Sequence, residues 1–436
     1  MKTLPKILTT ALAGALALGA TTLGATPTGA AQAGVTHPVV VNANPVDTTP
    51  HVLDGETHTV LDLGSRVLVG GAFTKVKRWS KPEVFTRNNL FAYDKATGTI
   101  DPAFAPQLNG KVTALLPAAD GKVYVAGQFK NVGGVAGISY LIKVDPATGA
   151  LVPAFAPAVN GMVYDIHLAN GKLYVGGTFT KIRNLVRSNF AVIDPTTGKA
   201  GTADVAFTTA TRGTTRVMRF DATPDGRKLV VIGNFTKVGG QTRQNAAVLD
   251  LTAAGGATVN GWTTDLYRTG LCSSSYDTYV YDVDVSPDGG WFVIVTTGGP
   301  HGTSTLCDTA ARWETNVNGP AATTWRNYTG GDSLTSVAIT GPVVYVAGHQ
   351  RWANNPQGAD TAGPGALTRQ GIAALAPATG KALTWNPGRE RGLRAFRIVP
   401  TPEGLYILSD STKFANEYHP RLTYLTVAGG TAPVVA

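Results

Sequence analysis

The sequence repeats a unit of about 50 residues, and this repeat limits the possible folds more than any other feature. A short apolar strand ending in glycine marks the unit, and Gly71, Gly127, Gly177 and Gly233 lie 56, 50 and 56 residues apart. Similar strands occur at 292–296, 343–348 and 405–409. A later aromatic residue recurs in the same order, at Phe104, Phe155, Phe207, Trp262, Trp325 and Trp385. The agreement of independent marks indicates about seven repeated units.

Each unit reads as four antiparallel strands joined by tight turns. In the second unit the predicted strands are 112–116, 123–127, 140–144 and 151–156. Asp145, Pro146 and Gly149 suit the turn between the last two, because Asp caps a turn, Pro presets φ and Gly accepts a positive φ. The chain is rich in glycine and shows no long 3.6-residue period, so an all-β fold is predicted.

A four-stranded sheet of this size cannot bury both faces alone, so the units must stack on one another. Radial stacking leaves no long exposed edge. We therefore predict a β-propeller of about seven four-stranded blades, near 57–110, 111–161, 162–213, 214–270, 271–331, 332–392 and 393–436. In the preceding segment, 34–56, a strand at 39–42 is expected to join the last sheet and close the ring. A linear β-solenoid is the alternative, although its coils are usually shorter.

The motifs of the first units resemble a known repeat. G-K-V-Y-V-A-G-Q-F at 121–129 is followed by D-P-A-T-G at 145–149, and G-K-L-Y-V-G-G-T-F at 171–179 by D-P-T-T-G at 194–198. This pattern resembles the delta-60 repeat, a bacterial β-propeller repeat. The resemblance is best over 60–254 and poorest over 291–313, which lacks the Gly-x-Phe signature. It implies a secreted or surface propeller and brings no catalytic residues.

The first 33 residues are predicted to be a cleavable signal peptide. Lys2 and Lys6 precede an apolar stretch, 7–20, and an A-x-A cleavage site follows at 31–33. An uncleaved anchor is the alternative, but the stretch is short for crossing a bilayer. We expect a secreted or cell-surface protein with no stable membrane insertion after cleavage.

The chain contains two cysteines, Cys272 and Cys307, within one unit. Because paired thiols persist as disulfides outside the cytosol, a bond that ties down a long loop is predicted. A redox or metal role for the pair is the alternative.

The loops between the second and third strands are long, and binding residues concentrate on such loops. They hold most of the excess positive charge of a chain whose formal net charge is +9. The candidate ligand-binding residues are four cations of the first loop and two tryptophans suited to sugar rings: Lys75, Lys77, Arg78, Lys81, Trp79 and Trp352. The alternative is that loop aromatics pack the loops down and that cations serve the repeat, as the recurrence of Arg87, Arg187, Arg243 and Arg369 in register indicates.

Polar pairs occupy i and i+2 positions on three successive first strands, which line the channel of a propeller. They are Asp165 with His167, Arg219 with Asp221, and Asp282 with Asp284. Side chains two residues apart point to one side of a strand, so the candidate catalytic residues are Asp165, His167, Asp221, Asp282 and Asp284, acting as acid and base or on a cation. Ion pairing between blades, with Arg219 and Arg397 as counter-charges, is the competing and favoured interpretation.

Known nucleotide, hydrolase, EF-hand and zinc motifs do not occur in the sequence. We expect no cofactor, no metal and no nucleic-acid partner, and a monomer. The favoured function is a binding module for an anionic or glycan-containing extracellular polymer or for a protein. The alternatives are a carbohydrate hydrolase or lyase that uses the channel carboxylates, and a structural module without a discrete ligand.

Overall fold

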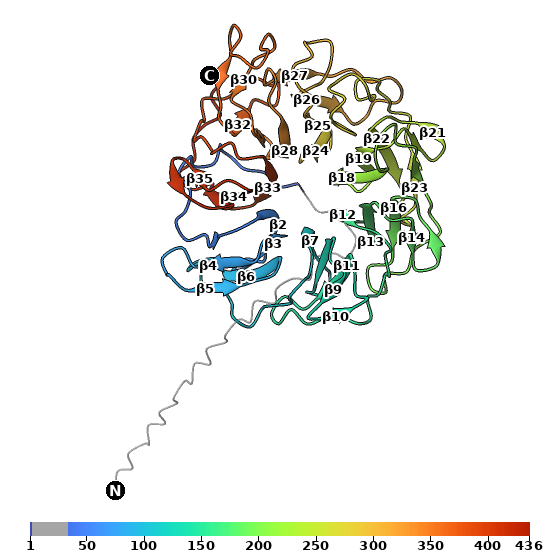
Figure 1. Ribbon diagram of the computed structural model, residues 1–436, viewed down its shortest axis with the longest axis vertical. Helices are drawn as coiled ribbons and strands as arrows, with labels where there is room; N and C mark the ends of the chain where they lie inside the picture. Colours follow the sequence, from blue (N-terminus) through green and yellow to red (C-terminus); the bar gives the residue numbers. More distant parts are fainter. Residues whose placement is uncertain (2–33) are drawn as a thin grey trace.

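The protein is described by a computed structural model that covers Met1 and residues 34–436; the predicted signal peptide otherwise lies outside the described residues. The regular elements of the described part are β-strands, arranged as a ring around a central axis (Figure 1). No helix in this part is long and apolar enough to cross a membrane.

Seven radial antiparallel sheets of the described residues surround the centre of the ring, each with its first strand innermost (Figure 1). They are β2(Glu56–Asp62)-β3(Arg66–Ala72)-β6(Leu90–Asp94), β7(Val112–Pro117)-β8(Val123–Gly127)-β11(Leu141–Val144), β12(Val163–Ala169)-β13(Lys172–Gly177)-β16(Phe190–Ile193), β18(Arg216–Ala222)-β19(Lys228–Asn234)-β22(Ala246–Leu251)-β23(Ala257–Val259), β24(Val280–Val285)-β25(Trp291–Thr296)-β26(Thr309–Glu314)-β27(Trp325–Tyr328), β28(Leu334–Ile339)-β29(Val344–Gly348)-β32(Ile372–Leu375) and β33(Ala395–Thr401)-β34(Gly404–Ser409)-β37(Leu422–Thr426). This radial arrangement is that of a β-propeller.

The fourth strands are shorter than the sequence predicts. Only β23 and β27 extend their sheets to four strands. In four other sheets the fourth strand is a single bridge, such as Val144 with Leu151. Pro153 follows Leu151 closely, and a proline cannot donate to the ladder. The aromatic residue Phe155 is nevertheless buried, so this segment contributes a core side chain instead of a strand.

A β-bulge recurs in the innermost strand of all seven sheets and explains the marker glycines. The pairing of β12 with β13 shifts register between Val163 and Asp165, and the other six first strands shift at the equivalent place. A Cβ atom on Gly177, opposite this bulge, would lie 2.1 Å from the carbonyl oxygen of Met162. Gly71, Gly127, Gly233 and Gly348 would meet carbonyl oxygens at 2.1 to 2.2 Å in the same way. A side chain is therefore excluded at these positions.

The core lies between neighbouring sheets. In one such cluster Tyr174 and Phe190 of one sheet pack against Phe220 and Leu229 of the next, and all are buried. Full burial of side chains of this size stabilises a fold by roughly 1.5 to 3 kcal/mol each. Because each sheet buries both faces only against its neighbours, the ring is stabilised as a whole.

The N-terminal segment closes the ring by pairing with the last sheet. Val40 pairs with Thr431 as an antiparallel bridge, and the amides of Asn42 and Val46 donate to the carbonyls of Thr426 and Tyr424 at 2.8 and 3.0 Å. The outer edge of β37 is thus covered by chain from the opposite terminus, at the position expected for 39–42.

The long loops form hairpins at the periphery of the ring (Figure 1). They are β4(Lys75–Lys77)-β5(Val84–Thr86), β9(Asn131–Val132)-β10(Val135–Ala136), β14(Lys181–Ile182)-β15(Leu185–Val186), β20(Lys237–Val238)-β21(Gln241–Thr242), β30(Trp352–Ala353)-β31(Leu367–Thr368) and β35(Lys413–Phe414)-β36(Glu417–Tyr418). Two further strands, β1(His51–Val52) and β17(Phe207–Thr208), extend the first and fourth hairpins. The fifth sheet carries a loop instead, which the bond between Cys272 and Cys307 ties down; the predicted disulfide is confirmed.

Candidate functional site

The channel carboxylates link the innermost strands of neighbouring sheets. The amide of Phe220 donates to Asp165 at 3.3 Å, and the amide of Val285 donates to Asp221 at 2.9 Å. Asp282 accepts from the amide of Val337 at 3.1 Å, and Asp284 from the amide of Ile339 at 2.6 Å. Each carboxylate therefore accepts a hydrogen bond from a backbone amide on the innermost strand of the next sheet. The innermost strands of neighbouring sheets do not pair with each other, so these amides need side-chain acceptors.

Two half-buried arginines balance part of this negative charge. Arg397 Nη1 lies 3.3 Å from Asp165 Oδ1, and Arg219 lies 4.0 Å from Asp165 and 3.8 Å from Asp282. Burial lowers the pKa of Arg219, with the nearby Arg397 adding to this effect. The pKa of Arg397 is raised, because four surrounding carboxylates outweigh its desolvation. The favoured prediction, ion pairing between blades, agrees with these contacts.

A cavity of about 480 Å³ opens beside the carboxylates and is lined by Asp165, His167, Asp221, Asp282, Asp284 and Arg397 among other residues. Burial raises the pKa of Asp284 well above its ordinary value, and Asp221 adds to the shift. Burial also raises the pKa of Asp282 and lowers that of His167. His167 Nδ1 stands 3.7 Å from Asp221 Oδ1. The four carboxylates that line the cavity already accept hydrogen bonds from backbone amides of the next sheet.

The recurring arginines are structural. Arg187 is buried, and its guanidinium donates to the carbonyls of Val186 at 2.7 Å and Gly201 at 2.6 Å. Arg243 makes the same pair of contacts with Thr242 and Asn260. Arg87 and Arg369 repeat the pattern. Each ties the peripheral hairpin to the link that leads into the next sheet, so these cations are not available to a ligand.

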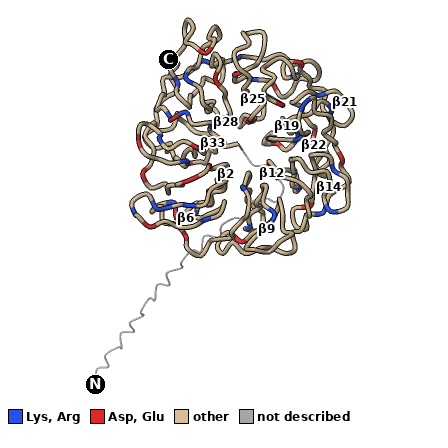
Figure 2. Tube along the Cα trace, viewed as in Figure 1, with Lys and Arg blue, Asp and Glu red and all other residues tan. Residues whose placement is uncertain are grey.

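The lysines of the first hairpin form no ion pair with any residue of 34–436. Lys75 and Lys81 are exposed and Lys77 is half-buried. The ion-paired lysines of the described residues lie elsewhere, at Lys95, Lys122, Lys143 and Lys228. Arg78 differs, because its Nε donates to the carbonyl of Thr97 at 3.0 Å. The first hairpin, β4-β5 with the loop 78–83, therefore carries four cations, Lys75, Lys77, Arg78 and Lys81, against one acid, Glu83. Around the ring as a whole, Lys and Arg are interspersed with Asp and Glu (Figure 2).

The two candidate tryptophans lie on different hairpins. Trp79 is 37% exposed and packs against the turn at Gly98, where an added Cβ would lie 3.1 Å from its ring. Trp352 has one face covered by the guanidinium of Arg351, 4.3 Å from the ring centre. Arg351 is held in turn by Asp332 at 2.8 Å. The structure thus brings Trp79, but not Trp352, to the basic lysines.

Sequence reasoning missed the residues at the bulges and just before the third strands. The hydroxyls of Thr113 and Thr335, within bulges, donate to the carbonyls of Val163 and Ala395 on the next sheet at 2.7 Å each. Asn189 and Asn245 adopt positive φ, and their side-chain Nδ2 groups donate to the carbonyls of Phe207 and Tyr267. The recurrence of Asn two residues after the arginine was the available signal.

Comparisons with known proteins identify the fold. The propeller of Dos1 is 10% identical, with a TM-score of 0.51, and the match covers 90% of this chain and 96% of that one. The WD40 β-propeller domain of Doa1 matches at 9% identity and a TM-score of 0.43, over 89% and 96% of the two chains. The similarity to the Dos1 structure confirms a β-propeller fold. No family profile matches the chain, and no curated protein does.

Proposed function

We propose that this chain is an exported, seven-bladed propeller of the delta-60 repeat type that binds an anionic or glycan-containing polymer outside the cell. The leader pattern at 1–33 supports export. The bond between Cys272 and Cys307 supports it independently, because disulfides persist in oxidising compartments. Each radial sheet is taken as one blade.

One observation carries the proposed binding surface: three lysines that form no ion pair within the described part of the chain share one hairpin. Lys75, Lys77 and Lys81 lie on the first hairpin, whereas Lys130, Lys237 and Lys413 are divided among three others. The exposed edge of Trp79 adds an apolar surface beside them. A polyanion gains most where several cations contact it at once, and an aromatic ring suits the apolar face of a sugar.

The test is binding to a purified phosphodiester-type cell-wall polymer at physiological salt. Changing Lys75, Lys77 and Lys81 to Gln should reduce affinity at least tenfold. The matched control changes Lys130, Lys237 and Lys413 to Gln, which removes the same charge from separate hairpins, and should cost less than threefold. Equal losses from the two triple variants would contradict a discrete surface.

A protein partner is the second candidate, favoured by exposed apolar residues on the peripheral hairpins. Val84, Val135, Leu185, Val186 and Tyr418 are 48 to 60% exposed. Short strands with unpaired edges can receive a partner strand. If Leu185 and Val186 changed to Ser abolish capture of a protein partner while polymer binding persists, this second function holds.

A further inference from the structure

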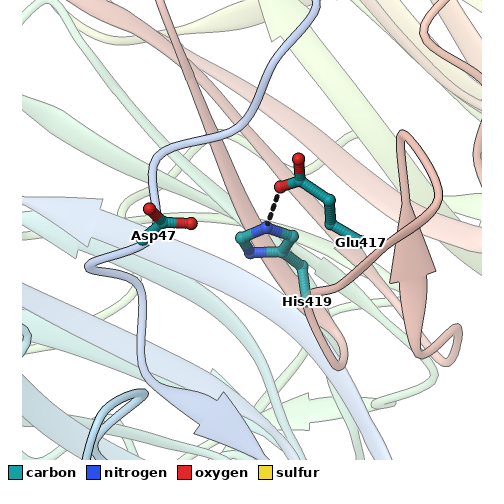
Figure 3. Close-up of side chains that lie close together, drawn as sticks. All are labelled: Asp47, Glu417 and His419. Carbon is teal, nitrogen blue, oxygen red and sulfur yellow. Dashed lines mark hydrogen bonds and ion pairs between the residues drawn. The ribbon is translucent and has the colours of Figure 1, made fainter.

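Three potential metal ligands from opposite ends of the chain meet where the ring closes. Asp47 follows the N-terminal stretch that pairs with β37, whereas Glu417 lies in β36 and His419 follows it. One ligand atom from each of the three residues lies within 4.8 Å of the other two. In Figure 3 the imidazole of His419 lies between the two carboxylates. We propose that Asp47, Glu417 and His419 bind a divalent transition metal, of which Zn²⁺ is the best fit, and that this ion joins the two ends of the ring.

The spacing of the ligand atoms agrees with a zinc site. His419 Nε2 lies 3.2 Å from Glu417 Oε2. Zinc bonds of about 2.0 to 2.2 Å in a tetrahedron place neighbouring ligand atoms roughly 3.3 to 3.5 Å apart. Two of the three ligands therefore already have the separation that the ion requires. Asp47 is exposed and lies in a turn, so its carboxylate can approach by the remaining distance.

The burial of His419 fixes the imidazole that would supply the nitrogen ligand. This residue is 5% exposed, and its Nδ1 is buried without a hydrogen-bond partner in the described part of the chain. The other nitrogen, Nε2, faces the cluster, so the contact with Glu417 is the ring's one hydrogen bond to the described residues. A ring fixed by burial loses little freedom when it binds a metal.

The surrounding charges fit a divalent cation. Asp47 and Glu417 supply two negative charges, and Asp47 takes part in no ion pair or hydrogen bond among residues 34–436 through its side chain. The cations of the neighbouring strands are Lys413, across from Tyr418, and Lys77, across from His51. Neither is ion-paired with the cluster. Imidazole and carboxylate ligands together suit Zn²⁺.

Because the site lies where the two ends of the chain meet, the ion would stabilise the closure of the ring. Tyr418 stacks edge-on against His51 with ring centres 5.0 Å apart, which fixes β36 beside β1. The closure is otherwise held by hydrogen bonds such as those of Val40 and Asn42. A metal bound to residues 370 positions apart would cross-link the first and last segments and stabilise the closed ring. This inference does not depend on polymer binding.

The test is titration of the purified, chelator-treated protein with ZnCl₂, followed by calorimetry and thermal unfolding. One Zn²⁺ should bind per chain, and saturating metal should raise Tm by about 2 to 4 °C. Asp47→Asn and Glu417→Gln, both at exposed positions, should each weaken zinc binding at least tenfold and abolish the Tm increase. Glu83→Gln, an exposed acid on the first hairpin, is the matched control and should behave as the wild type.

Co²⁺ gives a readout independent of stability. A bound Co²⁺ with nitrogen and oxygen ligands should show visible absorption that is lost in the Asp47→Asn and Glu417→Gln variants. Failure to bind one equivalent of Zn²⁺, or equal binding in these variants and in the wild type, would overturn the proposal and leave His419 and Glu417 as a hydrogen-bonded pair.

Discussion

Asp308 shows how strongly one buried group can couple stability to pH. The residue is 1% exposed, and both carboxylate oxygens lack a well-formed hydrogen bond among the described residues; the nearby amide of Gly299 lowers the pKa but does not offset the desolvation. Desolvation raises the pKa of Asp308 to about 7, and the charges of Asp332 and Asp360 add to the shift. The group binds its proton more tightly in the folded chain than in the unfolded one.

Because its folded pKa is raised, Asp308 should make the protein less stable as pH rises from about 4 to about 7. Below this window Asp308 is protonated in both the folded and the unfolded chain. Above it, the folded chain bears the full free-energy cost of keeping this carboxylate ionised and buried. Asp308→Asn removes the charge, so the variant should exceed the wild type in free energy of unfolding by on the order of 2 to 4 kcal/mol at pH 8 and by much less at pH 4. Denaturant unfolding at the two pH values measures this.

Asp265→Asn, at an exposed position, is the control for that comparison and should show no such trend. A difference between Asp308→Asn and the wild type that stays constant from pH 4 to pH 8 would mean that Asp308 does not hold a proton in the folded state.

At the scale of the strand, the channel carboxylates are best explained as structural groups that link neighbouring sheets. Asp165 is buried, receives the amide of Phe220 and faces Arg397, whose side chain is partly exposed to the channel. Removing one partner of such a buried pair leaves the other charge uncompensated. Asp165→Asn should therefore lower the free energy of unfolding by about 2 to 3 kcal/mol, less than for a fully buried pair because solvent screens Arg397 in part.

Glu403→Gln is a suitable comparison, because Glu403 pairs with Lys95 at the surface and is 74% exposed; it should cost no more than about 1 kcal/mol. If Asp165→Asn were as stable as the wild type but lost an activity on glycans, the carboxylates would have a catalytic role instead.

The strand also shows why part of the site could be predicted and part could not. Asp165 and His167 both follow the bulge, so their two-residue spacing correctly placed them on one side of β12. The bulge itself was not predicted, because the glycine opposite it reads as an ordinary strand end. The fourth strands were over-predicted, since a buried aromatic such as Phe155 marks a core position whether or not its backbone pairs.

At the scale of the whole molecule, the periodic marks were sufficient to predict a ring of radial sheets. The position of the long loops was not predictable in the same way. They turn outward into hairpins because residues such as Arg187 and Asn189 tie them to the link between sheets. The arginine and the asparagine do recur in register, but their recurrence does not tell which backbone carbonyl, 14 to 18 positions further on, each side chain contacts. The cluster of Asp47 with His419 was equally hidden, because only ring closure brings the ends of the chain together.

The proposed function makes the first hairpin of this ring a polyanion-binding surface, and the dependence of affinity on salt tests that claim most directly. Exposed charges are screened beyond about 8 Å at 0.15 M salt. Affinity for a phosphodiester polymer should fall by at least tenfold between about 0.05 and 0.5 M NaCl. When Lys75, Lys77 and Lys81 are Gln, the logarithm of the affinity should fall less steeply with the logarithm of the salt concentration. Affinity that is independent of salt, or a slope unchanged by the three substitutions, would contradict the account.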